Sequence, residues 1–330
     1  MKNKQIALTI GDVGGIGPEI IIKALNSPGI CAGLNKFLLI GNKNLLLAKA
    51  SELDLKLDFP ENVEISDIPF DISKLVIGKP TVEAGKHSFL ALKKACELAQ
   101  EGKISAIVTA PVSKEAINNA GYYYSGQTEI LEEYLRTPEI NKLQAEMLFV
   151  AENLRVMLLT RHVKLSSVSS GLSIDGIIKS VSALNNSLIN DFKLKEPKIA
   201  ICGLNPHSGE NGLLGNEENN LIKPALDKLI NKYGISIEGP FPADALWANV
   251  AKNYLKGENL SYDAYIACYH DQGLIPVKML APKKAVNTTI NLPVIRTSPS
   301  HGTAYDIAGQ NTADYQSMTE AINLAILLKK

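Results

Sequence analysis

Short apolar runs of strand length alternate with helix-like segments along most of this 330-residue chain. Strands that alternate with helices are typical of α/β proteins, in which the helices cover the faces of a mostly parallel sheet. The pattern therefore predicts a doubly wound α/β architecture. The runs expected to form strands are 6–10, 37–40, 106–108, 147–150, 156–159, 199–202 and 265–268, and helix-like segments include 18–25, 87–100, 114–119 and 217–232.

One pair of runs departs from this alternation. The runs 147–150 and 156–159 are separated only by residues 151–155, which is too short for a helical crossover between parallel strands. An antiparallel hairpin is expected there, so the sheet should be mixed. A chain of 330 residues is long enough for about two domains. Because no repeat and no low-complexity linker is found, the two domains should be intertwined.

Charge and composition exclude several classes of partner. Lysine and arginine balance aspartate and glutamate at 34 each, so no overall positive field favours nucleic acid or an anionic membrane. No apolar run approaches the roughly 20 residues that span a bilayer. The beginning, MKNKQIALTIGD, has a short apolar run that is typical of a first strand. Four separated cysteines without a CxxC motif fit a reducing compartment, which predicts a cytoplasmic protein.

Three of the five histidines follow predicted strands: His162, His207 and His270. Ligands of open α/β sheets bind beyond the carboxyl ends of the strands, and three protein ligands with an open position describe a catalytic metal site. A single histidine at such a place is more often a surface or capping residue, but three equivalent places favour a shared metal. The spacing matches no HExxH or finger motif. Asp271, beside His270, could orient the histidine, act as a base or cap a helix.

Two glycine-containing loops lie at opposite ends of the chain, TIGDVGGIGPEI and HGTAYDIAG. The first does not match GxGxxG, because Ile20 stands at the third glycine, so it is either a tight turn or a ligand loop. Together the loops resemble the isocitrate and isopropylmalate dehydrogenases. The resemblance implies two intertwined α/β/α domains with a mixed sheet and a cleft between them. It also implies that the second loop binds NAD(P) through His301, Gly302, Thr303, Ala304, Asp306 and Gly309.

Within that superfamily the chain is most similar to the PdxA family, the 4-hydroxythreonine-4-phosphate dehydrogenases of vitamin B6 synthesis. The similar stretches include TAPVSKEAINNAG, SGQTE, CGLNPHSGENGLLGNEE, GPFPADALW, YHDQGLIPVK and VNTTINLPVIRTSPSHGTA. The resemblance implies a divalent metal on His162, His207 and His270, and a homodimer whose active site lies at the subunit interface, with His270 contributed by the partner. It implies a cofactor-side domain of 1–135 plus 285–330, and a metal and dimerisation domain of 136–284.

The resemblance also implies substrate contacts from Thr128, Lys278, Asn287 and Arg296. Gln127 stands where the family usually has histidine; it can donate a hydrogen bond but carries no charge. Arg296 is one of only four arginines and suits bidentate binding of phosphate, although a surface ion pair is the alternative. Lys278 lies in the apolar stretch LIPVKML, where a buried amine would need an anionic partner.

The implied reaction is the NAD(P)-dependent oxidation of a phosphorylated hydroxy amino acid, followed by decarboxylation of the β-keto acid. A divalent ion would bind the hydroxyl group and lower its pKa. Asp244, Asp271 and Lys278 are the candidates for proton transfer. Histidine ligands favour zinc or cobalt over magnesium, but the sequence does not choose among the three, nor between NAD and NADP.

Three other functions remain open at this point. A dehydrogenase of threonate or erythronate 4-phosphate offers the same metal and phosphate groups. A zinc-dependent hydrolase could use the three histidines but would not need the HGTAYDIAG loop. A non-catalytic phosphate-binding module would explain Lys278 and Arg296 but not the histidines.

Overall fold

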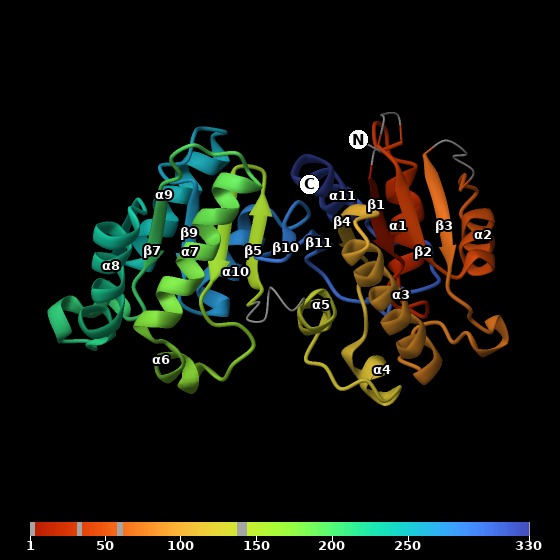
Figure 1. Cartoon of the computed structure of the whole chain (residues 1–330), viewed down its shortest axis with the longest axis horizontal. Helices are drawn as coiled ribbons and strands as arrows, with labels where there is room; N and C mark the ends of the chain where they lie inside the picture. Colours follow the sequence, from red (N-terminus) through yellow and green to blue (C-terminus); the bar gives the residue numbers. More distant parts are fainter. Residues whose placement is uncertain (1–3, 32–34, 58–61, 137–143, 330) are drawn as a thin grey trace. The chain divides into compact units, whose positions relative to one another are not determined.

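The computed structural model describes residues 4–31, 35–57, 62–136 and 144–329. Contacts within the chain divide it into two units: unit 1 comprises residues 1–145 and 286–330, and unit 2 comprises residues 146–285. The sequence analysis placed these boundaries after residue 135 and after residue 284. Each unit combines strands and helices (Figure 1), so the α/β class with a mixed sheet is confirmed.

Unit 1 contains six strands in the order β3-β2-β1-β4-β11-β10. All neighbours in this order are parallel except β10 and β11, which pair antiparallel. Strands β1, β2 and β4 are almost completely buried, as expected for strands covered on both faces. Their bounds are β1 (Gln5–Thr9), β2 (Phe37–Gly41), β3 (Val63–Asp67), β4 (Ile104–Thr109), β10 (Val286–Ile290) and β11 (Ile295–Pro299).

Helices cover the sheet of unit 1. Helices α3 and α5 contribute Ala91, Ala95 and Leu131 to a core cluster that also contains Ala7 of β1 and Ile107 of β4. Side-chain oxygens at three helix starts (Asn42, Thr81 and Ser113) accept bonds from free backbone N–H groups. The helices are α1 (Gly17–Leu25), α2 (Lys43–Glu52), η1 (Ile72–Lys74), α3 (Val82–Gln100), α4 (Lys114–Asn119), α5 (Gln127–Leu135) and α11 (Gln316–Leu328).

Unit 2 contains five strands in the order β5-β6-β9-β7-β8. Strands β5 and β6 form the antiparallel hairpin that the sequence predicted, whereas β6, β9, β7 and β8 are parallel to their neighbours. The carboxyl ends of β6, β9 and β7 therefore meet at one edge of the sheet. The bounds are β5 (Glu146–Ala151), β6 (Leu154–Leu158), β7 (Ile199–Cys202), β8 (Ile237–Phe241) and β9 (Ala264–Ala267).

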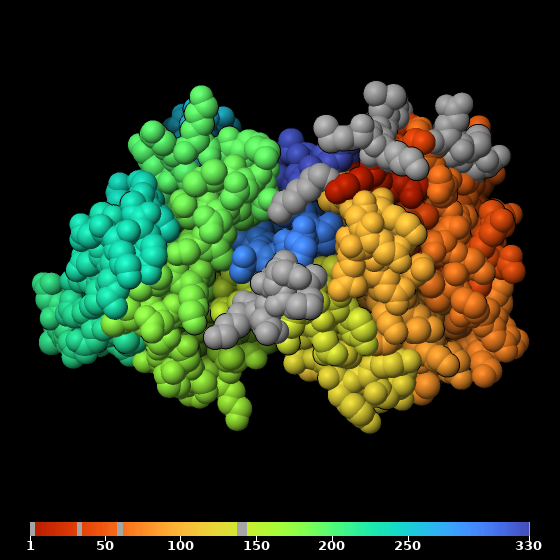
Figure 2. All heavy atoms as spheres, in the orientation of Figure 1, coloured from red at the N-terminus to blue at the C-terminus, as the bar shows by residue number. Residues whose placement is uncertain are grey.

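The helices of unit 2 lie on both faces of its sheet. Leu246 and Val250 of α9 and Leu274 and Val277 of α10 pack in one core cluster with strand residues such as Tyr265. Helix α7 lies in front of the strands in Figure 1 and α8 lies to the left of β7, and the side chains of both form much of this part of the surface in Figure 2. The helices are η3 (Leu165–Ser167), α6 (Val168–Gly171), α7 (Ile174–Asn190), η4 (Pro206–Gly212), η5 (Glu218–Ile222), α8 (Lys223–Tyr233), α9 (Ala243–Leu255) and α10 (His270–Leu280).

The predicted strands and helices are all present, although several of their bounds differ, such as α3, which begins at Val82 and not at His87. The segment 217–232, expected as one helix, begins with a π-helical turn before α8. The run 265–268 ends one residue early, so that Cys268 follows β9. In the described part of the chain all four cysteines are free thiols, and no helix there is long and apolar enough to cross a membrane.

Close packing of α3 against α4 gives a test of the core of unit 1. A methyl group at Gly85 would overlap the backbone carbonyl of Ala116, which cannot move without displacing α4. We expect Gly85→Ala to lower the free energy of unfolding by about 1–3 kcal/mol, as overpacking usually does. Urea denaturation measures the change. Gly302→Ala is the control, because nothing lies near its added methyl group, and an equal loss in both variants would contradict the prediction.

Candidate functional site

The three predicted metal-binding histidines lie beyond the ends of three neighbouring parallel strands. His162 follows β6, His270 begins α10 after β9, and His207 lies in η4 after β7. Strand β9 pairs with both β6 and β7, so the three segments leave the same edge of the unit 2 sheet. Of the three imidazoles, those of His162 and His270 lie together, with ring centroids 5.5 Å apart and tilted by 45°.

This pair fits two ligands of one divalent ion. A bound histidine nitrogen lies about 2.1 Å from zinc, which puts each ring centre roughly 3 Å from the ion and two ring centres about 5 Å apart. His162 and His270 also line a common cavity of about 470 Å³, together with Arg161, Tyr269 and Asp271. Across residues 4–31, 35–57, 62–136 and 144–329, no three metal-binding side chains converge as a complete set. The chain thus brings two of the three histidines together and leaves His207 apart.

Asp271 orients the ring of His270. The Nδ1 atom of His270 lies 2.7 Å from Oδ1 of Asp271, and the aspartate side chain is mostly exposed. A carboxylate on one imidazole nitrogen fixes the ring and leaves the other nitrogen for an ion. Tyr269, not Asp271, occupies the N-cap of α10. Of the roles open from the sequence, the orienting role is therefore the one that the contacts support.

His207 lies in an unusual backbone turn. Residues His207–Asn211 have φ angles between 46° and 78°, and only Gly209 among them is glycine. Each left-handed L-residue costs about 1–2 kcal/mol, so the surroundings must hold this turn in place. Ser208 Oγ donates to Pro240 O at 3.0 Å. Just before the turn, Asn205 donates from its backbone and side chain to the buried carboxylate of Glu218. The turn leaves the imidazole of His207 exposed.

Arg296 is buried in unit 1 rather than placed in a surface loop. It lies in β11 with a relative exposure of 3%. Nε and Nη2 donate to Thr109 Oγ1 at 3.0 and 2.7 Å, and Nη1 donates to Thr289 Oγ1 at 3.2 Å. No carboxylate of the described residues lies within ion-pair distance of it. Burial lowers the pKa of Arg296 to about 10, although the charge of Glu129 opposes this, so the group stays cationic at neutral pH.

Buried acceptors without partners lie in the same unit. Oε1 of Gln127 and Oδ1 of Asn287 are buried, and neither has a hydrogen-bond partner among the described residues. Nε2 of Gln127 donates to Ala110 O at 3.3 Å, next in sequence to Thr109, which binds Arg296. Buried polar groups normally have partners. A buried cation without a carboxylate, and acceptors without donors, are groups that an anionic ligand with hydrogen-bond donors could satisfy. Thr128, another predicted contact, is buried beside Gln127.

The sequence-based argument for Lys278 was wrong. Lys278 lies on α10, where Leu274 and Val277 face the core and Lys278 itself is exposed. Of the apolar residues around it in sequence, Leu274 and Val277 are buried, but Ile275 and Met279 are exposed like Lys278 itself, so no buried amine needs a partner there. Asp244 is likewise exposed, in the first turn of α9. Their exposure leaves both side chains accessible without assigning either one a role.

The two glycine-containing loops from opposite chain ends are joined in unit 1. The backbone N–H of Ile16 donates to Thr303 O at 3.0 Å, and Tyr305 Oη donates to Asp12 Oδ2 at 2.8 Å. Asp12 is fully buried and also accepts from the Gly14 N–H at 2.8 Å. Burial raises the pKa of Asp12, while these hydrogen bonds oppose the rise.

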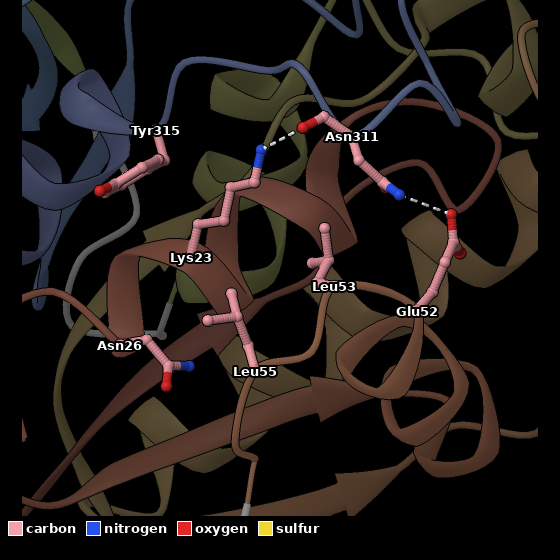
Figure 3. Close-up of a pocket in the computed structure, with 7 residues that line it drawn as sticks. All are labelled: Lys23, Asn26, Glu52, Leu53, Leu55, Asn311 and Tyr315. Carbon is pink, nitrogen blue, oxygen red and sulfur yellow. Dashed lines mark hydrogen bonds between the residues drawn. The ribbon is translucent and has the colours of Figure 1, made fainter.

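The end of the C-terminal loop is tied to α1. Lys23 Nζ donates to the carbonyl oxygens of Asn311 and Ala313 at 2.9 and 3.2 Å, and Glu19 accepts from the N–H of Ala313. Asn311 in turn donates to Glu52 at 3.0 Å, and Figure 3 shows Lys23 and Glu52 on either side of it. The loop thus has a fixed backbone between its two anchors. Its exposed residues include His301, Gly302, Asp306 and Gly309, whereas Thr303 and Ala304 are half-buried.

The family model of the pyridoxal phosphate biosynthetic protein PdxA matches residues 33–325. The chain belongs to the PdxA family. A 4-hydroxythreonine-4-phosphate dehydrogenase of Thermosynechococcus vestitus is 42% identical over 99% of this chain and 97% of its own length. The crystal structure of such an enzyme from Klebsiella pneumoniae is similar with a TM-score of 0.84, at 33% identity over 99% of this chain and 98% of that one.

One PdxA-like relative carries a different name. A protein of Oceanobacillus iheyensis, provisionally named a D-threonate 4-phosphate dehydrogenase, is 39% identical over 99% of this chain and 98% of its own length. Relatives in this range of identity are thus named for two different phosphorylated substrates.

Several residues of these sites were not found from the sequence. Thr109 and Thr289 bind Arg296, and Asp12 and Tyr305 join the two loops. The signals available were local: Thr109 directly follows the predicted strand 106–108, and Asp12 lies within the first glycine loop. Their partners are far away in sequence, so a single sequence gives no sign of the pairing.

The environment of Arg296 leads to a test of the hydroxyl group that holds its guanidinium group. Thr109→Val keeps the side-chain shape but removes the acceptor of two guanidinium N–H groups, which would stay buried. We expect a loss of about 1.5–3 kcal/mol in the free energy of unfolding, because charged hydrogen bonds are lost. Thr109→Ser, which keeps the hydroxyl group, is the control and should lose less. Chemical denaturation measures both, and equal losses would count against the role of the hydroxyl group.

Proposed function

We propose that this protein is a metal- and NAD(P)-dependent dehydrogenase that oxidises 4-phosphohydroxy-L-threonine. The product, 2-amino-3-oxo-4-phosphooxybutanoate, would decarboxylate to 3-amino-2-oxopropyl phosphate, in the synthesis of pyridoxal 5'-phosphate. The observation that carries the proposal is the buried Arg296 of a PdxA-family chain, a cation without a carboxylate partner. Relatives named 4-hydroxythreonine-4-phosphate dehydrogenase support the substrate.

In this proposal Arg296 binds the phosphate group, and Thr128 contacts the substrate beside it. The free acceptors of Gln127 and Asn287 would receive donors from the substrate, such as its amino or hydroxyl groups. A guanidinium fixed by two threonine hydroxyl groups is already oriented, so little side-chain entropy is lost on binding. His301–Gly309 would hold the cofactor on a backbone that is fixed before binding.

His162 and His270 would hold the divalent ion, with zinc or cobalt suiting imidazole ligands better than magnesium. The ion, when bound, supplies a Lewis acid that lowers the pKa of the substrate hydroxyl group, and NAD(P) accepts the hydride. Asp271 keeps the ring of His270 oriented through Nδ1. Asp244, Asp271 and Lys278 are the candidates to take up the hydroxyl proton. A hydrolase would have no use for the NAD(P) loop, and membership in a dehydrogenase family counts against it.

A second substrate has specific support. The Oceanobacillus iheyensis relative is named for D-threonate 4-phosphate, which lacks the amino group. Gln127, which replaces the usual family histidine, has a buried oxygen that needs a donor. An amine or a hydroxyl group could supply that donor, so the preference for the amino acid substrate rests on the relatives that are named for it.

A spectroscopic assay of NADH or NADPH formation separates the two. We expect 4-phosphohydroxy-L-threonine to be oxidised with a kcat/KM on the order of tenfold above that of D-threonate 4-phosphate, a difference of about 1.4 kcal/mol. A chelator should abolish the activity, and added zinc, cobalt or magnesium should restore it. A reversed preference would favour the second substrate, and no cofactor reduction with either would overturn the proposal.

The proposed active enzyme is a homodimer with a shared site. We propose that His162 and His207 of one subunit share the ion with His270 of the partner subunit, as the family resemblance implies. Within one chain His270 also lies beside His162, with ring centroids 5.5 Å apart, and His207 is exposed.

Mixed dimers test this assignment. In a heterodimer of His162→Ala and His270→Ala subunits, one site would regain all three ligands, so about a quarter of the wild-type activity should return after random exchange. The matched pair is His162→Ala with His207→Ala, in which both sites stay incomplete and no activity should return. Recovery in the second pair but not in the first would make His207 the ligand from the partner. Subunit exchange is verified by mass spectrometry of the intact dimers.

A further inference from the structure

Two polar side chains link the three histidine-bearing segments of unit 2. Thr160 Oγ1 donates to the carbonyl oxygen of Cys268 at 2.8 Å, and the Thr160 N–H donates to the same oxygen at 3.2 Å. Gln272 Oε1 accepts from the Cys268 N–H at 2.6 Å, and its Nε2 donates to Gly203 O at 2.7 Å. The N–H and the carbonyl group of Cys268 are thereby both bound, just beyond the end of β9.

These links lie within a few residues of each histidine. Thr160 precedes His162 by two positions, Cys268 precedes His270 by two, and Gly203 begins the segment that leads to His207. Thr160 therefore ties the His162 segment to the His270 segment, and Gln272 ties the His270 segment to the His207 segment.

The contact at Gly203 reaches the left-handed turn directly. A methyl group on Gly203 would lie 2.6 Å from Ser208 Oγ and 2.9 Å from Ser208 Cα, so the two residues are packed against each other. Ser208 follows His207 and is itself fixed by its bond to Pro240 O. Holding Gly203 in place therefore holds the backbone beside His207.

The chemistry of an amide suits the position of Gln272. Its oxygen must accept from an N–H group, and its nitrogen must donate to a carbonyl oxygen. A carboxylate can accept but cannot donate, so glutamate would satisfy Cys268 and set a negative oxygen against the carbonyl group of Gly203. The two bonds thus distinguish glutamine from its nearest isostere.

We propose that Gln272 and Thr160 are positioning residues that set the relative placement of the metal-binding histidines. The inference rests on the proposed function, since it concerns the metal site assigned there. In the proposed dimer the bond from Gln272 to Gly203 has a further consequence. It connects His207, which a subunit would use in its own site, to His270, which it would supply to the other site.

The test measures Co²⁺ binding by the full-length protein without cofactor or substrate. Residues that orient metal ligands typically change metal affinity about 10–100-fold when they are replaced. We expect Gln272→Glu to weaken Co²⁺ binding within that range and to alter the visible absorption of the bound ion, while the melting temperature without metal stays close to that of the wild type. Gln310→Glu is the matched control, because Gln310 also donates from Nε2 to a backbone carbonyl, that of Asp306 in unit 1.

A second pair of variants covers the case in which Gln272→Glu fails to fold. Thr160→Val removes the hydroxyl bond to Cys268 without changing the side-chain shape, and Thr160→Ser keeps it. Weaker Co²⁺ binding in the valine variant, restored in the serine variant, would support the positioning role. Wild-type Co²⁺ affinity and absorption in Gln272→Glu, or equal affinity in the two Thr160 variants, would overturn it. If the wild-type protein binds no Co²⁺, the proposed metal site itself fails, so the two failures are distinguishable.

Discussion

The parallel pairing of β6, β9 and β7 is the constraint on which the histidine site depends. Parallel neighbours point their carboxyl ends to the same edge, so the segments that follow them must begin side by side. His162, His270 and His207 lie in these segments although Thr160, beside His162, and Cys268, beside His270, are 108 positions apart in sequence. The hydrogen bonds of Thr160 and Gln272 to the backbone of Cys268, and of Gln272 to Gly203, hold these segments at fixed distances from one another. The parallel strands place the histidine-bearing segments at one edge of the sheet, and the side-chain hydrogen bonds then fix the positions of these segments relative to one another.

Electrostatics imposes the corresponding constraint on unit 1. A buried guanidinium without a carboxylate is costly, because desolvation disfavours the charged form and lowers its pKa to about 10. The hydroxyl groups of Thr109 and Thr289 accept hydrogen bonds from the guanidinium group but carry no negative charge to balance it. An anionic ligand would supply the missing charge. Such a ligand would stabilise the buried charge, which is the physical basis for the proposal that Arg296 binds phosphate.

Much of the fold could be predicted from the sequence, because many strands and helices produce recognisable patterns of apolar residues over a short stretch of chain. Strands such as β1 and β4 are continuous apolar runs, and the short spacing between β5 and β6 indicates a hairpin. Strand β3, with the sequence VEISD, was missed because none of its residues is fully buried and it carries no continuous apolar run. The reasoning on Lys278 failed for a related reason. The apolar stretch around it was interpreted as buried, but it forms a helix on which consecutive residues face different directions, so that Val277 is buried and Lys278 is exposed.

The sites were predictable only in part, because their geometry depends on pairs that are distant in sequence. The strand-end rule placed the histidines correctly along the edge, but nothing local indicates that His162 contacts His270 and not His207. The bond between Tyr305 and Asp12 spans 293 residues, and that between Gln272 and Gly203 spans 69. Motif resemblance suggested that the two glycine loops belong together. The residues that actually join them had to be read from the structure.

The left-handed turn at His207 connects this geometry to function. Four of its five residues carry side chains that disfavour the conformation, at about 1–2 kcal/mol each, and so the turn exists only because its surroundings hold it. The buried carboxylate of Glu218 accepts two bonds from Asn205, and a charge-assisted bond contributes about 1.5–3 kcal/mol, enough to offset much of that cost. A chain that only needed to connect β7 to η5 could use a relaxed loop. A strained loop that presents an exposed imidazole, away from His162 and His270 of the same chain, makes physical sense if that imidazole binds a metal ion or another ligand.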